Sequence, residues 1–179
     1  MIWKTEGILQ SIISSRKRSI AEQKSKMPQR TIERLARNYS ELPRKFFRDL
    51  KASYQKKSPA IIAEIKRASP SKGIIKENFD PQAIAKSYEL AGATCISVLT
   101  ETEFFLGSPD YIKLVKAACS LPILRKDFIV DDFQVFESKL IGSDCILLIA
   151  AILDISDLHR LYKLAISLDL DVLVEVHNS

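Results

Sequence analysis

The 179 residues, 46% hydrophobic and 27% charged, have the length and composition of one globular domain, and these values exclude a largely disordered chain. No apolar run approaches the roughly 18 residues that a membrane helix needs, so we expect a soluble protein. The cysteines are interpreted as structural thiols of a reducing compartment, which favours a cytoplasmic location. The sequence contains only two histidines, and its three cysteines lack CxxC spacing, which argues against a metal site or a disulfide framework.

Charge is distributed unevenly along the chain. Residues 1–57 contain 15 Lys and Arg against 5 Asp and Glu, whereas residues 58–179 contain 12 against 17. A basic arm of this kind could bind nucleic acid or a membrane, or act as an organelle address. The aromatic side chains of a nucleic-acid surface are missing from residues 8–30. We therefore interpret the arm as a solvated helix face and expect no nucleic-acid or membrane partner.

Residues 1–57 are predicted to form a helical extension. Thr5 can cap a first helix, whose isoleucines follow helical spacing and which ends before Pro28. Two shorter helices are expected at residues 31–39 and 44–52, on either side of Pro43.

From Ser58 onward, strand and helix patterns alternate. The expected strands are 59–65, 94–100, 121–126, 144–150 and 171–176. The expected helices start at Asp80-Pro81, Ser108-Pro109, Asp131 and Ser156, and end near residues 90, 119, 142 and 168. A repeat of roughly 27 residues is the size of a βα unit and predicts a parallel sheet. Periodicity leaves open whether this α/β sheet is doubly wound or belongs to a (β/α)₈ barrel, although the glycine fingerprint of dinucleotide binders is absent.

Charged side chains follow three of the five predicted strands. Glu64 and Lys66 end the first strand, residues 125–127 end the third, and Glu175 ends the fifth. Active sites of parallel α/β folds lie at the carboxyl ends of the strands, so these groups predict one shared site. The alternative is a set of salt bridges at the rim of the sheet.

The loop after the first strand offers groups that suit an anion. Residues 69–73 supply two hydroxyls, backbone amides and a lysine, a combination that favours phosphate. The same composition is also typical of an ordinary surface turn. With the nearby lysines, it points to a phosphorylated small-molecule substrate.

Four ordered motifs carry a resemblance to a known family. They are Ile62-Ala-Glu-Ile-Lys-Arg-Ala-Ser-Pro-Ser-Lys-Gly73, Ser97-Val-Leu-Thr-Glu101 with Phe104-Phe-Leu-Gly-Ser108, Leu121-Pro-Ile-Leu-Arg-Lys-Asp-Phe128, and Leu173-Val-Glu-Val-His177. From residue 8 to the last residue the chain closely resembles the indole-3-glycerol phosphate synthases of tryptophan biosynthesis. The resemblance implies a (β/α)₈ TIM barrel, with a helical extension at 1–57 and the first five βα units at 58–179.

The resemblance also implies a reaction and roles for individual residues. The family closes the pyrrole ring of 1-(2-carboxyphenylamino)-1-deoxyribulose 5-phosphate with loss of carbon dioxide and water, using no metal or organic cofactor. By motif, Lys126 would be the general acid, Glu175 a proton-transfer group in the dehydration, and Lys66 the partner of the substrate carboxylate. Glu64 would orient the lysines. The implied substrate contacts are Ser69 and Pro70 near the phosphate, and Phe105, Phe128 and Leu147 around the anthranilate ring.

The family continues through three further βα units, whereas this sequence stops at Ser179. We therefore expect little or no synthase activity from the isolated chain, and a second chain could supply the missing barrel units. A degenerate remnant that acts only as a binding scaffold is one alternative, but all four catalytic positions are intact. A related phosphate-binding barrel such as phosphoribosylanthranilate isomerase is another, but Glu64 and Lys66 together with residues 126–128 argue against it.

Overall fold

The computed structural model describes residues 3–176, with side chains from residue 7 onward. Three helices come first: α1 (Trp3–Lys26), α2 (Gln29–Arg37) and α3 (Phe46–Gln55). The main sheet contains β1 (Ile62–Ile65), β4 (Cys95–Leu99), β5 (Ile123–Lys126), β6 (Cys145–Ile149) and β7 (Asp171–Glu175). The helices between these strands are α4 (Pro81–Leu90), α5 (Asp110–Ala118), α6 (Asp132–Leu140) and α7 (Ile155–Ser167). Shorter elements are β2 (Ala68–Ser69), β3 (Gly73–Ile74) and the 3₁₀ turn η1 (Ala150–Ile152).

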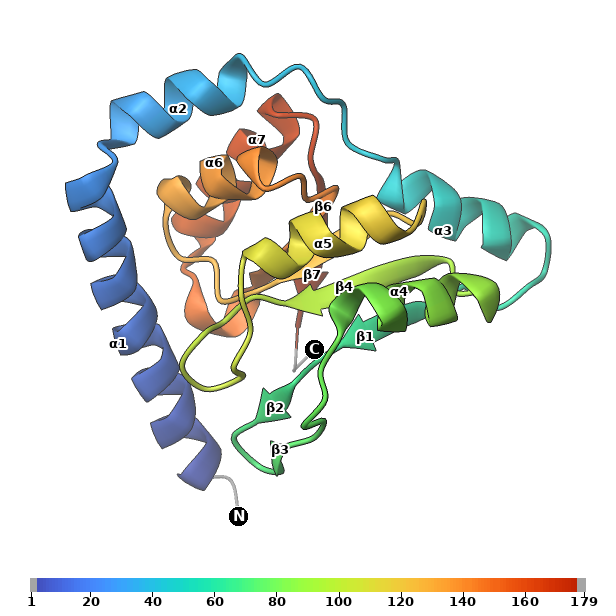
Figure 1. Ribbon diagram of the computed structural model, residues 1–179. Helices are drawn as coiled ribbons and strands as arrows, with labels where there is room; N and C mark the ends of the chain where they lie inside the picture. The colour runs from blue at the N-terminus through green and yellow to red at the C-terminus, as the bar shows by residue number, and fades with distance from the viewer. Residues whose placement is uncertain (1–2, 177–179) are drawn as a thin grey trace.

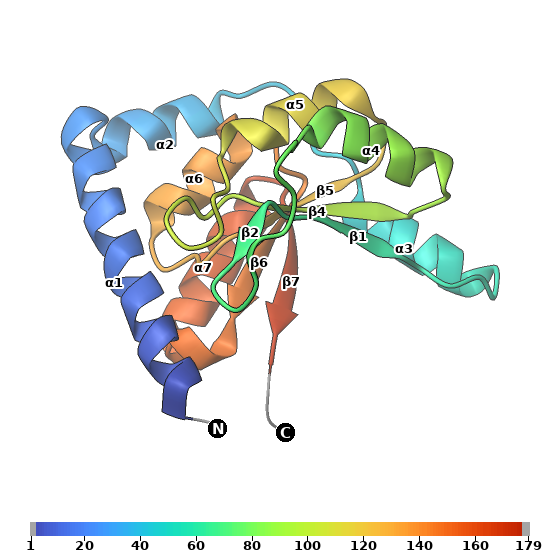
Figure 2. The same ribbon diagram turned by 60° about the horizontal axis from the view of Figure 1, so that its bottom comes forward.

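The order of the strands decides between the two architectures that periodicity left open. The sheet runs β1-β4-β5-β6-β7, and all four pairings are parallel. Each crossover therefore moves the chain by one strand in the same direction, which places the connecting helices on one face. A doubly wound sheet requires a reversal of this direction. The fold is thus α/β with barrel winding, and Figures 1 and 2 show the strands turning progressively from β1 to β7.

The two faces of the sheet have separate cores, because neighbouring residues of a strand point to opposite sides. On the outer face, Ile96 and Val98 of β4 pack with α4 and α5, while Ile146 and Leu148 of β6 pack with α6 and α7. Ile20 of α1 and Ile32 and Ala36 of α2 belong to the second of these clusters. The helical extension therefore shares its core with the βα units, and the predicted division into domains 1–57 and 58–179 stays a prediction.

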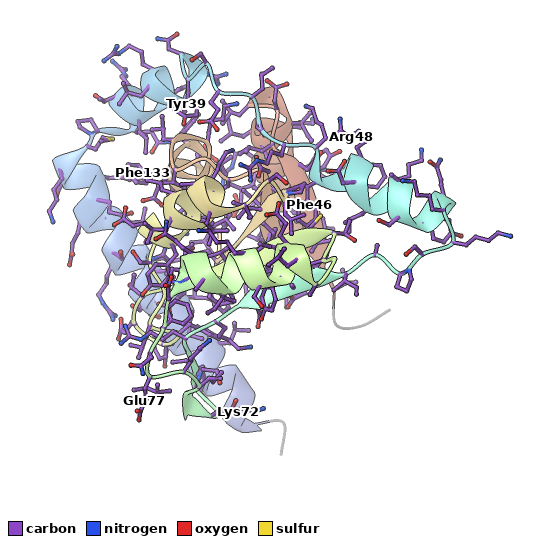
Figure 3. All side chains as sticks on the ribbon, turned by 45° about the vertical axis from the view of Figure 1, so that its right-hand side comes forward. Tyr39, Phe46, Arg48, Lys72, Glu77 and Phe133 are labelled. Atoms are coloured by element: carbon purple, nitrogen blue, oxygen red, sulfur yellow. The ribbon has the colours of Figure 1, made fainter. Side chains whose placement is uncertain are left out.

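The inner face is closed at one end by α3. Phe46, the first residue of α3, packs with Cys95 and Cys145, which are the first residues of β4 and β6. The other buried members of this cluster are Leu124, Leu147 and Ile149. Figure 3 shows Phe46 where α3 meets the sheet. Since the amino ends of the strands are covered in this way, the carboxyl ends remain as the open end of the interior.

Several boundaries differ from those expected. Helix α1 begins at Trp3, so Thr5 lies within its first turn and does not cap it. Helix α7 is capped by Asp154, whose carboxylate accepts a hydrogen bond from the Asp157 amide (2.7 Å), and Ser156 lies one residue inside the helix. An ionised carboxylate is a strong cap, so Asp154 sets the start of this helix. The short hairpin β2–β3 was not predicted, because two-residue strands carry no alternation signal.

The predicted caps at Asp80 and Asp131 are confirmed. Asp80 accepts hydrogen bonds from the amides of Gln82 and Ala83, and Asp131 accepts one from Phe133. At α5 the cap position is one residue later than predicted, at Pro109, although the Ser108 hydroxyl accepts a hydrogen bond from the Asp110 amide (3.2 Å). The helices of the extension lie close to their predicted places, at 29–37 instead of 31–39 and at 46–55 instead of 44–52.

All three cysteines are free and buried. Burial raises the pKa of the Cys95 thiol to about 12, and it also raises the pKa of Cys119 and Cys145. These thiols stay protonated at neutral pH, as is usual for buried structural cysteines. Within residues 3–176, no helix combines the length and the apolar character that crossing a membrane requires.

A buried carboxylate at the amino end of β6 joins three parts of the chain. Asp144 has no exposed surface. One of its oxygens accepts hydrogen bonds from the Arg44 amide (2.7 Å) and the Lys116 ammonium (3.0 Å), and the other accepts from the Ile123 amide (2.8 Å). The linker before α3, helix α5 and strand β5 are thereby fixed to one side chain.

We expect Asp144→Ala to lower the free energy of unfolding by about 3 kcal/mol, because it leaves two backbone amides without their acceptor and removes one carboxylate partner of the mostly buried Lys116. Urea denaturation followed by circular dichroism measures the loss. Asp110→Ala is the matched control, since the Asp110 side chain is 78% exposed; it should cost less than about 1 kcal/mol. Equal losses in the two variants would contradict a central role for Asp144.

Candidate active site

A pocket of about 270 Å³ opens at the carboxyl ends of the strands. It is lined by Glu64, Lys66, Leu99, Phe105, Lys126, Asp127, Phe128, Leu147, Ile149 and Glu175. The four residues predicted to be catalytic all lie in this lining, together with the three predicted to surround an aromatic ring. Five strands contribute to one hollow, so the charged strand ends converge as the sequence indicated.

Strand alternation explains why these particular side chains face the pocket. Ile62, Leu124 and Leu173 pack against the inner-face core. Each stands two residues before a charged residue of the pocket, namely Glu64, Lys126 and Glu175 respectively. Residues two apart on a strand point the same way, so the charged groups continue the inner face where the apolar layers end.

The charged groups form two ion pairs. The Lys126 ammonium lies 3.3 Å from a carboxylate oxygen of Glu175, which joins the ends of β5 and β7. Lys66 pairs with Glu64 at the end of β1. All four side chains are about one-third exposed. The charged strand ends therefore form salt bridges, as the alternative interpretation of rim salt bridges expected. These salt bridges also line a pocket, where a ligand could reach both lysines.

The remaining wall of the pocket is apolar. The rings of Phe105 and Phe128 have centroids 6.1 Å apart and are tilted by 37°. Leu147 and Ile149 of β6 also line the pocket. A flat aromatic ligand would find apolar contacts on this side and ammonium groups on the other. The arrangement suits an aromatic carboxylate better than a wholly polar ligand.

Glu101 shapes this wall, and reasoning from residue patterns did not single it out. Its carboxylate is buried and accepts hydrogen bonds from the amides of Glu103 (2.9 Å), Phe104 (2.7 Å) and Phe105 (3.0 Å). At the other end of the loop, a Cβ on Gly107 would lie 2.5 Å from the Leu99 carbonyl oxygen. The signal that could have identified Glu101 is a carboxylate two residues after the mostly apolar stretch 95–99.

Ser69 and Pro70 do not line this pocket. They lie on the β2–β3 hairpin, where the Ser69 hydroxyl accepts a hydrogen bond from the Lys72 amide (3.3 Å) and Pro70 is exposed. Figure 3 shows Lys72 and Glu77 at the end of the molecule remote from Phe46. The hairpin follows Lys66 by two residues, but Ser69 and Pro70 themselves lie outside the lining of the pocket, and their phosphate contact stays a prediction.

Residues that could hold a metal ion are not gathered in the described part of the chain. Among residues 3–176, no group of three or more His, Cys, Asp and Glu side chains has a suitable arrangement. His177, the last residue of the fourth motif, lies outside the described residues. The expectation that the reaction needs no metal or organic cofactor stays a prediction.

A buried charge network lies directly behind the pocket. Asp127 is fully buried, and one of its oxygens accepts hydrogen bonds from Arg125 (3.1 Å), Arg16 (3.1 Å) and Thr100 (2.6 Å). Burial alone would raise the pKa of Asp127, but the two guanidinium groups and the Thr100 hydroxyl outweigh burial and hold this pKa below its ordinary value of 3.8.

This lowered pKa predicts a contribution to acid unfolding. The stabilisation is fully present above the unfolded-state pKa of 3.8, and it is lost as the pH falls through the lower folded-state pKa. We expect the free energy of unfolding to fall between about pH 5 and about pH 3, with a shallower slope in Asp127→Asn. Urea titrations across this range measure the slope. Asp110→Asn is the exposed control and should keep the wild-type slope; an unchanged slope in Asp127→Asn would refute the assignment.

Comparison with known proteins places these features in context. Residues 9–179 match the family model of indole-3-glycerol phosphate synthase. The chain is similar to the indole-3-glycerol phosphate synthase of Polaromonas naphthalenivorans (strain CJ2), with 49% identity over 171 residues. The match covers 96% of this chain and 65% of the relative. The chain thus spans about two-thirds of the length of that relative.

Proposed function

The chain belongs to the indole-3-glycerol phosphate synthase family, a family of TIM barrels, and on this basis we propose that its pocket is the catalytic centre of such a synthase. The proposed activity is that of a carbon–carbon lyase of tryptophan biosynthesis, acting on 1-(2-carboxyphenylamino)-1-deoxyribulose 5-phosphate. The observation that carries the proposal is the meeting of the Lys126–Glu175 and Lys66–Glu64 pairs with the phenylalanine wall in one pocket. That combination matches a substrate with an aromatic ring, a carboxylate and a reactive carbonyl.

In the proposed mechanism, the aromatic carbon that bears the carboxylate attacks the ketone carbon of the sugar chain, forming the new carbon–carbon bond. Lys126 donates a proton to the ketone oxygen, so that a hydroxyl forms in place of an alkoxide. Breaking the bond to the carboxylate releases carbon dioxide and restores the aromatic electrons. The new hydroxyl then leaves as water while the neighbouring CH₂ carbon of the new ring loses a proton, and Glu175 transfers that proton to the departing hydroxyl. The product is indole-3-glycerol phosphate.

The other residues of the pocket bind and orient the substrate in this proposal. Lys66 pairs with the substrate carboxylate, and Glu64 holds Lys66 in place until the substrate arrives. Phe105, Phe128 and Leu147 enclose the anthranilate ring and exclude water from the reacting carbon. Ser69 and Pro70 would approach the phosphate only if the β2–β3 hairpin folds over the pocket, and we include that movement in the proposal.

We further propose that additional βα units pair with the two outer strands in the active protein. In the described residues, β1 pairs only with β4, and β7 pairs only with β6. Exposed apolar side chains accompany both edges, including Ile61 beside β1 and Val174 and Val176 at β7. Unpaired edges with apolar side chains favour association. The further units could lie in the same polypeptide or in a second chain.

The partners in this proposal are therefore the phosphorylated substrate and the barrel-completing units, with no nucleic acid and no membrane. We propose a cytoplasmic location, which the three free, buried thiols support because unpaired cysteines suit a reducing compartment.

We expect Lys126→Met to lower kcat by about 10²- to 10⁴-fold, since it removes the proton donor while keeping the apolar stem of the side chain. The assay follows indole fluorescence as the product forms, with the chain supplemented by the part of the Polaromonas relative that the match does not cover. The matched control is Lys113→Met on α5, an exposed lysine that should leave kcat unchanged.

Turnover by Lys126→Met equal to that of the wild type would refute the proposed role of Lys126. Conversion of N-(5-phosphoribosyl)anthranilate without ring closure would instead support the isomerase alternative. A supplemented chain that binds the substrate and turns over neither compound would support the scaffold alternative.

A further inference from the structure

The N-terminal helix reaches the back of the pocket through a buried arginine. Arg16 of α1 is almost completely buried, and its Nη2 donates to Oδ2 of Asp127 at 3.1 Å. Figure 1 shows α1 running along one side of the molecule, beside the loop that follows β4. A residue early in the chain is thereby fixed to the carboxyl end of β5.

Asp127 lies between two residues of the pocket. Lys126 precedes it and Phe128 follows it, and both line the pocket. The second oxygen of Asp127 accepts a hydrogen bond from the Phe128 amide (2.8 Å). The position of the Asp127 carboxylate therefore fixes the backbone that carries the predicted general acid and one phenylalanine of the wall.

The charge balance around Asp127 requires Arg16. Arg125 is also fully buried, and the same Nη2 that bonds Asp127 lies 2.6 Å from a carboxylate oxygen of Glu137. One guanidinium is thus shared between two carboxylates, and Arg16 supplies the second positive charge. Breaking a buried pair leaves an uncompensated charge, so loss of Arg16 would force the Asp127 segment to rearrange toward water.

The residue next to Arg16 reaches the other phenylalanine of the wall. The Ser15 hydroxyl donates to the carboxylate of Glu103, in the loop that carries Phe105. The Glu103 amide in turn donates to Glu101, which holds the Phe105 amide as well. Two successive residues of α1 therefore contact the two segments from which the Phe105–Phe128 wall is built.

We propose that Ser15 and Arg16 of α1 are positioning residues that hold the Phe105–Phe128 wall and the Lys126 backbone in register. The effect of this positioning on catalysis rests on the function proposed above. The positioning itself concerns only the geometry of this chain. Neither residue touches the pocket, so both act through Glu103 and Asp127. Side chains that line a catalytic pocket have to be held within about 0.5 Å of their productive positions, and a buried ion pair behind them can provide this rigidity.

Another contact of α1 provides the control. Lys24 pairs with Asp131 at 2.7 Å, and both side chains are about one-third exposed. This pair also joins α1 to the βα units, at the start of α6, but neither residue lines the pocket. Lys24→Gln therefore removes an anchor of α1 without touching the segments of the wall.

The experiment measures nuclear Overhauser effects between the ring protons of Phe105 and Phe128, with specifically labelled phenylalanine in the full chain and no ligand. We expect Arg16→Gln and Ser15→Ala each to weaken these effects by at least about twofold, because a displacement near 0.5 Å is magnified by their steep distance dependence. Arg16→Lys, which restores the charge, should recover part of the signal. Lys24→Gln should leave it unchanged.

Unchanged ring contacts in folded Arg16→Gln and Ser15→Ala would overturn the proposal, as would an equal loss in Lys24→Gln, which would indicate general loosening of α1. If Arg16→Gln does not fold, Ser15→Ala alone tests the proposal. Unchanged ring contacts in Ser15→Ala, or an equal loss in Lys24→Gln, would then overturn it. Binding of anthranilate, followed by its fluorescence, separates this proposal from the proposed function. A wild-type chain that keeps the ring contacts and does not bind anthranilate would contradict the function and leave the positioning role intact.

Discussion

The carboxylate of Asp127 is buried where the N-terminal helix, the sheet and the pocket meet, and its charge has to be compensated there. Arg125 from the same strand and Arg16 from α1 compensate it, and Thr100 adds a hydroxyl donor from the end of β4. A buried charge that loses a partner is costly, so these contacts fix three segments relative to one another. The surface of the pocket is built on the residues next to this carboxylate.

The pocket combines two kinds of surface that a single element could not provide. Its ion pairs come from the ends of β1, β5 and β7, and its aromatic wall comes from the loops after β4 and β5. Parallel strands bring their carboxyl ends to one edge, so charged groups spread over more than a hundred residues line one pocket. The helical extension contributes to the same structure, because Phe46 closes the opposite end of the interior and Ile20 joins the outer core.

Local signals were sufficient for most of the secondary structure. The caps at Asp80 and Asp131 and the apolar runs of the five strands each depend on a few neighbouring residues, and all were predicted. Errors occurred where two nearby polar residues could cap, as at Asp154 and Ser156, where a helix began before its expected cap, as at Thr5, and where a strand was too short to show alternation, as in β2–β3. The candidate site was predicted for the residues that end strands, because position on a strand alone determines that Glu64, Lys126 and Glu175 face inward.

Sequence alone thus determined the alternation of strands and helices, the charged strand ends and the likeness to one enzyme family, since each of these is written in short segments or ordered motifs. Tertiary structure decided between barrel winding and a doubly wound sheet, because that choice lies in the order of the strands, which periodicity does not encode. It also revealed the contacts of Arg16 with Asp127 and of Ser15 with Glu103, which join residues about a hundred positions apart. Such pairs leave no local pattern, because only the packed chain brings them together.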